Sequence, residues 1–182
     1  MPDEVAGPVE ADGAVRHVFV YGTLRRGGSN DIARYRPVPQ FVGVGRIAGT
    51  LYDLGAYPGA LLAGASQGGG RRAVHGGLIH GEIYRITGAV EAALDVLEEV
   101  RDDGSGEYVK REIDVALADA IEALEAIEAD GAVGAAEADE SAESVDRIRA
   151  GARTLRCLVY EIHPSRISER IVIESGDWFR RH

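Results

Sequence analysis

The hydrophobic pattern of the chain starts with an apolar run over residues 15–21, which contains Val18-Phe19-Val20-Tyr21. The run is continuous instead of alternating, and this predicts a strand that is covered on both faces. It stops at Gly22-Thr23-Leu24, where a basic, glycine-rich loop begins and extends to about residue 30. A strand that ends so abruptly leaves backbone N–H groups in the loop, and we expect the loop to form the floor of a small-molecule pocket.

The strand-like segments that follow are rich in glycine. Residues 41–62 are predicted to form strands broken by glycines, with a turn at Tyr57-Pro58-Gly59. Glycines inside strands are typical of bulges, barrel corners and close backbone approach. Between the first strand and this region, Ser29 or Asn30 is expected to cap a short helical segment over 31–36.

The clearest helical pattern covers residues 89–100, where Val90, Ala93, Leu94 and Leu97 fall on one face. Strand patterns precede it at 74–86 and follow it at 108–117 and 154–162. Strands and helices therefore do not alternate regularly, which argues against a doubly wound parallel sheet. The order favours an α+β domain with a curled or closed mixed sheet.

Two acidic segments differ in composition from the rest of the chain. Residues 1–14 are rich in Pro, Gly and Ala and are predicted to be a disordered tail. Residues 118–150 hold ten Asp and Glu against two Arg, and we interpret them as a low-complexity insertion between two strands, part helix and part disordered. The domain itself is placed at 15–182, and Ser175-Gly176-Asp177-Trp178 near its end is expected to dock on the body.

The net charge of −10 is concentrated in these two segments, so the body is close to neutral. Nucleic acid is not an expected partner, because phosphate binding needs a basic face. No apolar segment reaches the length of a membrane-spanning helix, and the N-terminus lacks the features of a signal peptide, so we expect a soluble, cytoplasmic protein. The single cysteine, Cys157, excludes an internal disulfide and is predicted to be buried and inert.

Several well-known motifs match the sequence without the context that they need. Residues 43–48 fit the dinucleotide pattern G-x-G-x-x-A, and residues 64–68 fit the nucleophile elbow G-x-S-x-G. Both patterns require a helix directly afterwards, and glycines follow instead. His75 and His80 would face opposite sides of a strand, so they are not expected to share a metal ion.

One carboxylate is placed better for chemistry. Glu98 lies one turn beyond Leu94 and borders the apolar face of the predicted helix, whereas Glu99 points towards water. The pattern alone leaves a second interpretation open, in which Glu98 is an exposed residue at a helix end.

The order of the motifs resembles a known family. The chain carries Val18-Phe19-Val20-Tyr21-Gly22-Thr23-Leu24-Arg25, then Tyr57-Pro58-Gly59, Gly81-Glu82-Ile83-Tyr84, and Leu94-Asp95-Val96-Leu97-Glu98 followed by Tyr108. Members of the gamma-glutamylcyclotransferase-like family show an F-x-Y-G-T-L-like start, a G-E-x-Y strand and an L-D-x-x-E helix followed by Y-x-R. The resemblance covers about residues 15–117 and 154–163.

The resemblance implies a small mixed β-barrel of about six strands with one main helix. It implies a γ-glutamyl compound as the small-molecule substrate, bound by Tyr21, Gly22, Thr23 and Leu24, with Glu98 as the catalytic general acid and base. 5-Oxoproline would be released by intramolecular attack of the substrate's α-amine. No metal and no organic cofactor are implied.

The sequence departs from the family pattern after Tyr108. Lys110 stands where the arginine of Y-x-R is usual, or Arg111 is displaced by one position. The doublet Glu98-Glu99 leaves a small ambiguity of register. Two other functions remain open at this point: a binding module without catalysis on the same barrel, and a related acyl or amide transfer that uses the same carboxylate.

Overall fold

The computed structural model describes residues 15–63, 77–101, 103–117 and 154–181. The predicted tail at 1–14, the predicted insertion at 118–150, the rejected elbow at 64–68 and His75 lie outside these residues. The described residues form one α-helix, α1 (Gly88–Leu97), and seven strands: β1 (Arg16–Val20), β2 (Gln40–Asp53), β3 (Pro58–Leu62), β4 (Gly77–Ile86), β5 (Tyr108–Leu117), β6 (Thr154–Ile162) and β7 (Ile171–Val172).

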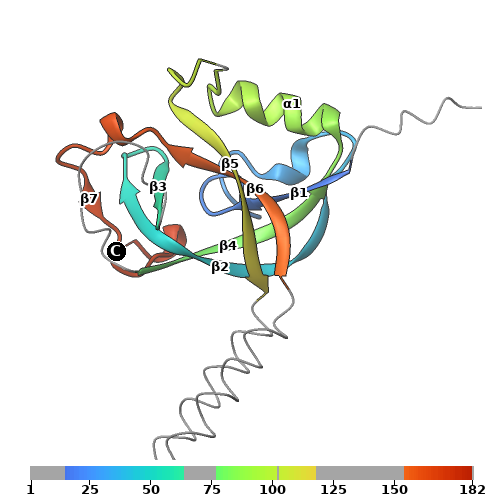
Figure 1. The fold of residues 1–182 in the computed structure, drawn as a ribbon. Helices are drawn as coiled ribbons and strands as arrows, with labels where there is room; N and C mark the ends of the chain where they lie inside the picture. The colour runs from blue at the N-terminus through green and yellow to red at the C-terminus, as the bar shows by residue number, and fades with distance from the viewer. Residues whose placement is uncertain (1–14, 64–76, 102, 118–153, 182) are drawn as a thin grey trace, which may run out of the picture.

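Five of the described strands close into a barrel in the order β2-β4-β1-β6-β5, and β2 pairs with β5 to complete the ring. The remaining strands, β3 and β7, each pair with β2. The β1–β6 pair is parallel and the others are antiparallel, so the sheet is mixed. The predicted α+β fold, a small mixed barrel with one main helix, is confirmed (Figure 1).

Two hydrophobic clusters account for the continuous apolar run in β1. Phe19 and Tyr21 belong to a cluster with residues of all the ring strands, which fills the barrel. Val18 and Val20 belong to a second cluster with Val90 of α1, on the outer side of the barrel wall. Figure 1 shows α1 lying over β1. Because both faces of β1 are covered, every residue from position 18 to position 21 is buried, as predicted.

β2 differs from the prediction, because it is one strand of 14 residues instead of several broken ones. Its register shifts between Phe41 and Gly43, which is a bulge. A Cβ on Gly45 would lie 2.8 Å from the carbonyl oxygen of Ala116, and a Cβ on Gly49 would lie 2.6 Å from that of Leu61. The glycines therefore allow close approach of neighbouring strands in the curved sheet and do not end the strand.

Two local predictions of ends and caps are also wrong. The helix ends at Leu97 and not near residue 100, and Glu98 is its C-cap. The short helical segment after β1 is a 3-10 helix, Ile32–Arg34, whose cap is Asp31 and not Ser29 or Asn30. The Asp31 carboxylate accepts hydrogen bonds from the backbone N–H groups of Ala33 and Gly27, both at 2.9 Å.

The C-terminal segment docks on the body, as predicted. Trp178 is buried in the cluster that fills the barrel. The carbonyl oxygen of Gly176 accepts a hydrogen bond of 2.9 Å from the backbone N–H of His80 in β4. Cys157 is also buried, and burial raises the pKa of its thiol to about 12, so this thiol is unreactive near neutral pH.

Candidate active site

A cavity of about 280 Å³ lies where β1, α1, β3 and β5 meet. All five residues that the sequence and the resemblance single out line it: Tyr21, Gly22, Thr23, Leu24 and Glu98. The cavity is also lined by residues that were not predicted as site residues: Phe19, Val20, Asn30, Tyr57, Pro58, Leu97, Glu99, Glu107, Tyr108 and Tyr160. Its volume suits a small molecule.

Three consecutive residues of the loop after β1, Gly22, Thr23 and Leu24, line the cavity, and we name them the loop wall. The carbonyl oxygens of these three residues accept hydrogen bonds from the N–H groups of Arg25, Asn30 and Ile32. Within the described part of the chain, their own N–H groups donate no backbone hydrogen bond. The loop is thus held by its carbonyl groups, and its N–H groups remain available to an anionic ligand group.

Gly22 is required at its position by close packing. A Cβ at Gly22 would lie 2.5 Å from Cγ and 2.8 Å from Cδ of Pro58, the first residue of β3. The predicted turn at Tyr57-Pro58-Gly59 is wrong, because Pro58 and Gly59 already belong to β3. The contact with Gly22 explains why this motif accompanies the first strand in the motif order. The proline ring covers the glycine, and together they shape one end of the cavity.

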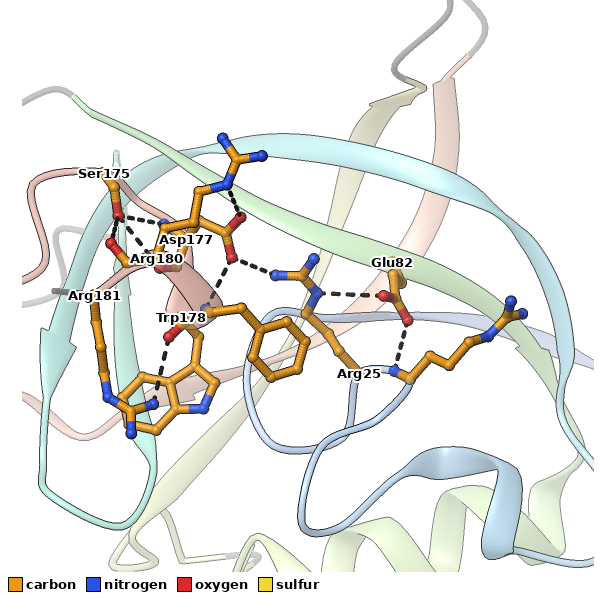
Figure 2. A network of polar contacts seen from close by, with 9 residues as sticks. Arg25, Glu82, Ser175, Asp177, Trp178, Arg180 and Arg181 are labelled. Carbon is orange, nitrogen blue, oxygen red and sulfur yellow. Dashed lines mark hydrogen bonds and ion pairs between the residues drawn. The ribbon is translucent and has the colours of Figure 1, made fainter.

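The loop is anchored from behind by two acidic residues (Figure 2). The guanidinium group of Arg25 donates to Glu82 at 3.4 Å and to Asp177 at 2.7 Å. Glu82 also accepts hydrogen bonds from the backbone N–H of Arg26, at 3.0 Å, and from the hydroxyl of Tyr84, at 2.8 Å. The G-E-x-Y strand therefore fixes the loop, and the C-terminal segment contributes through Asp177.

Three carboxylates, Glu98, Glu99 and Glu107, also line the cavity, and we name them the carboxylate wall. Glu98 is partly buried, and Glu99 is exposed at the rim with φ = 50°. Glu107 precedes β5 and accepts a hydrogen bond of 2.9 Å from the hydroxyl of Tyr57. As predicted, Glu98 is less exposed than Glu99. Glu99 nevertheless also borders the cavity.

Among the three carboxylates of the cavity, Glu98 is the one whose pKa is raised by the fold. Burial, and in second place the nearby charge of Glu107, raise its pKa to about 7. In the described residues, no hydrogen-bond donor or cation is paired with its side chain. A carboxyl group with a pKa near neutrality can both accept and donate a proton at physiological pH.

Buried tyrosines surround Glu98 and are tied to the frame of the barrel. The hydroxyl of Tyr21 donates to the carbonyl oxygen of Tyr160 at 2.6 Å, and that of Tyr108 donates to the carbonyl oxygen of Pro58 at 2.7 Å. Burial, together with the charge of Glu98, raises the pKa of Tyr21 well above its usual value. These hydroxyls therefore stay protonated and help to define the shape of the cavity.

The side chains of Lys110 and Arg111, one of which replaces the arginine of the family pattern Y-x-R, point in different directions. Lys110, the only lysine of the chain, contacts α1 through Glu91 and Asp95, both at 2.7 Å. Arg111 pairs instead with Glu161 at 2.9 Å, and Glu161 is buried. Lys110 lies two residues after Tyr108 and, by strand alternation, on the same side of β5, which favours Lys110 as the replacement of the usual arginine; the assignment stays a prediction.

The closed barrel holds a small cavity in which a loop with available N–H groups and an unpaired carboxyl group lie together, which is typical of a protein that binds a small molecule. Comparison with known sequences identifies the family. The chain belongs to the family described as gamma-glutamyl cyclotransferase, AIG2-like, whose model matches residues 18–180. The resemblance inferred from the motifs is confirmed.

Individual relatives agree with this membership. The chain is 36% identical over 95 residues to the gamma-glutamylcyclotransferase family protein YtfP of Escherichia coli, and the match covers 52% of this chain and 68% of that protein. A relative from Vibrio cholerae is 36% identical over 91 residues, which cover 46% of this chain and 62%, or less than two thirds, of the relative. An AIG2-like protein from Mus musculus shares the fold, with a TM-score of 0.51, 21% identity, and coverage of 84% of this chain and 82% of that one.

No helix in the described part of the chain has the length and apolarity that crossing a bilayer requires. The roles of the individual site residues, including that of Glu98, stay predictions.

Proposed function

We propose that the protein is a gamma-glutamylcyclotransferase-type enzyme that releases 5-oxoproline from a γ-glutamyl amide, with Glu98 as general acid and base. One observation carries the proposal: a partly buried carboxyl group, Glu98, with a pKa of about 7 and no partner in the described residues shares a small cavity with three available backbone N–H groups. Family membership supports the same class of reaction.

The reaction needs no nucleophile from the protein. The α-amine of the substrate attacks its own γ-carbonyl carbon, so that one C–N bond forms and closes a five-membered lactam. The C–N bond to the leaving amine then breaks. The nitrogen that attacks loses a proton and the nitrogen that leaves gains one, so a single carboxylate can transfer the proton between them, for roughly 10²–10⁴ in rate.

The loop wall has a separate role in this proposal. The N–H groups of Gly22, Thr23 and Leu24 bind an anionic part of the substrate, either its α-carboxylate or the oxyanion that develops on the γ-carbonyl. The cavity holds the flexible γ-glutamyl group in the folded shape that cyclisation requires, which reduces the entropic part of the barrier. The small volume of the cavity, about 280 Å³, supports this confinement.

Glu98→Gln tests the proposal directly. Glutamine has nearly the same shape but cannot accept the proton, so 5-oxoproline formation from a panel of γ-glutamyl amines, amino acids and peptides is expected to fall by at least 10²-fold. The product is measured by mass spectrometry, and the fold is checked by thermal unfolding. Turnover like that of the wild type in the Gln variant would show that Glu98 is not the acid and base.

Glu112→Gln provides a matched control. Glu112 is an exposed carboxylate of β5 that pairs with Arg16 and Arg156 and does not line the cavity. Its substitution is expected to leave 5-oxoproline formation unchanged.

If the wild type binds γ-glutamyl compounds but converts none of the panel, the protein is a binding module. Products other than 5-oxoproline would indicate a different acyl transfer.

A further inference from the structure

One edge of β3 has no strand beside it. Hydrogen bonds join β3 to β2 along the other edge, and within the described residues no second strand pairs with β3. In an antiparallel pair, every second residue turns its backbone N–H and C=O groups away from the partner strand. The N–H of Ala63 donates to Ala48 of β2 at 3.0 Å. By alternation, the residues whose backbone groups point away from β2 are Pro58, Ala60 and Leu62.

Three side chains of the barrel meet these backbone groups, one for each residue. The hydroxyl of Tyr108 donates to the carbonyl oxygen of Pro58 at 2.7 Å, the N–H of Ala60 donates to the hydroxyl of Tyr21 at 3.3 Å, and the N–H of Leu62 donates to the carboxylate of Glu161 at 2.9 Å. We name these three side chains the edge clamp. They come from β5, β1 and β6, and they take the place of the missing strand, because buried backbone groups without partners are costly.

Glu161 is the member of the edge clamp that lies outside the cavity. Tyr21 and Tyr108 line the cavity, whereas Glu161 does not. Its side chain is only 4% exposed, and it lies two residues after Val159, on the face of β6 that fills the barrel. An apolar side chain is usual at such a position, because a buried carboxylate is costly unless it is paired and hydrogen-bonded.

Arg111 provides the pairing. Its Nε donates to one carboxylate oxygen of Glu161 at 2.9 Å, while the other oxygen accepts from the N–H of Leu62. Glu161 therefore bridges β5 and β3 from its place on β6. A methionine or leucine could fill the same space, but it would offer no acceptor to the free edge of β3.

The place of β3 matters to the cavity because the strand begins with Pro58. Pro58 lines the cavity and covers Gly22 of the loop wall, where no Cβ would fit beneath the proline ring. Tyr108 holds the strand at Pro58, and Glu161 holds it at Leu62, the last residue of β3. A loose bond at the far end would let the strand, and Pro58 with it, shift against the loop wall.

We propose that Glu161, oriented by Arg111, is a positioning residue of the active site, which holds the free edge of β3 and so keeps Pro58 against the loop wall. The consequence for catalysis rests on the proposed function. Binding of the substrate is expected to depend on Glu161 more than the proton transfer does, because Glu98 lies at the end of α1 and not on β3.

Amide hydrogen exchange of the full chain tests the contact without a substrate. Glu161→Met suits the buried space but removes the acceptor, so the Leu62 amide is expected to exchange about tenfold faster. Glu161→Gln keeps an acceptor oxygen and should keep the protection of the wild type. If Glu161→Met does not fold, Glu161→Asp replaces it, because its carboxylate keeps the charge but is one methylene group too short to hold β3. Unchanged exchange of the Leu62 amide in these variants overturns the proposal.

Kinetics tests whether the contact positions the site. Glu161→Met, or Glu161→Asp in its place, is expected to raise KM for the γ-glutamyl substrate about fivefold, with kcat changed by less than about twofold, and Glu161→Gln is expected to restore KM. Val115→Ala controls for a general loss of stability, since Val115 is fully buried in the barrel but does not line the cavity. It should lower the melting temperature and keep the KM of the wild type.

The outcomes separate this inference from the function on which it rests. An equal rise in KM in Val115→Ala, or a Glu161→Gln variant as impaired as Glu161→Met, overturns the positioning role while 5-oxoproline formation by the wild type still supports the proposed function. If the wild type forms no 5-oxoproline, the proposed function fails, and the role of Glu161 in substrate binding fails with it. Exchange of the Leu62 amide then decides whether Glu161 holds β3.

Discussion

The loop wall and the carboxylate wall line the same cavity, yet they are built in opposite ways. The loop wall presents backbone N–H groups, and the side chain that follows it, Arg25, is neutralised behind it by Glu82 and Asp177. The carboxylate wall presents acidic side chains that no cation neutralises in the described residues. The charge next to the first wall is thus balanced by neighbouring side chains, whereas the carboxylates of the second wall have no cationic partner among the described residues.

This difference follows from where each wall comes from. The loop wall lies between a buried strand and a docked C-terminal segment, so packing on several sides fixes it. The carboxylate wall lies at the end of α1 and the start of β5, where the chain turns at the surface. A surface turn can carry charges without partners at little cost, since water still reaches part of them. Only Glu98 extends far enough inward for its pKa to reach about 7.

The pH dependence of activity offers the largest test of the carboxylate wall. If ionised Glu98 is the base, kcat/KM is expected to rise about tenfold per pH unit and to level off above a midpoint near 7, as the pKa of about 7 requires. Glu107→Gln is expected to move the midpoint downwards, because the charge of Glu107 is the second cause of the raised pKa. A midpoint near 4.5, the ordinary value for glutamate, would contradict the burial of Glu98.

Stability gives an independent measure of the same pKa. Native Glu98 keeps its proton between pH 4.5 and about 7, where the unfolded chain has released it. The native state thus binds more protons in this window, so the contribution of Glu98 to the free energy of unfolding is present below pH 4.5 and is lost as the pH rises through 7. The wild type is expected to lose stability relative to Glu98→Gln over this window, as measured by denaturant unfolding, whereas Glu112→Gln follows the wild type.

Arg25→Gln weakens the loop wall without changing any residue that lines the cavity. The substitution removes the ion pairs to Glu82 and Asp177, whose side chains are only 11% and 14% exposed. The expected loss of unfolding free energy is about 1–3 kcal/mol. KM is expected to rise about tenfold with kcat changed less than threefold, because the N–H groups of the loop bind substrate less well once the loop is less ordered.

The neighbouring arginine is the control for this effect. Arg26 contacts Glu82 through its backbone N–H, which Arg26→Gln keeps, and its own side chain is exposed. This variant is expected to keep the KM of the wild type. Arg25→Lys should recover part of the affinity, because a lysine can still pair with Asp177. A change in kcat alone in Arg25→Gln, with KM unaffected, would show that the loop wall does not bind the ground-state substrate.

The sequence predicts the two walls to different extents, for physical reasons. The loop wall follows from local signals, since a continuous apolar strand that ends at Gly22 indicates both burial and a turn whose N–H groups are not used in a sheet. Glu98 follows from helical spacing and from the family resemblance. Glu107 and Tyr57 were not predicted as site residues, because their contact joins positions fifty residues apart and leaves no periodic signal.

The errors in the fold have similar causes. The glycines of β2 were interpreted as breaks, but Gly45 and Gly49 serve contacts with β5 and β3 that only the closed barrel creates. The helix was predicted to continue to residue 100, because Glu98 and Glu99 do not disfavour a helix. The chain leaves the helix there through the left-handed conformation of Glu99, which packs against Gly106. Tertiary packing decides both cases.

Lys110 gives the smallest expected effect, and it concerns how the carboxylate wall is supported. Burial opposes the charge of Lys110, but the hydrogen bonds to Asp95 and Glu91 outweigh it and raise the pKa of the ammonium group. Asp95 also accepts a hydrogen bond of 2.8 Å from Tyr160, which lines the cavity. Lys110 therefore joins β5 to the turn of α1 that precedes Glu98.

Lys110→Met is expected to lower the free energy of unfolding by about 1 kcal/mol, a small value because the lysine side chain is 27% exposed and its ion pairs are partly screened. The value of kcat is expected to fall two- to fivefold, since the end of α1 and with it Glu98 becomes less well positioned. Lys110→Arg, which restores the usual family residue, should keep both quantities close to those of the wild type. If Lys110→Met also matches the wild type in kcat, the apolar contacts of Val90 and Leu94 suffice to position Glu98.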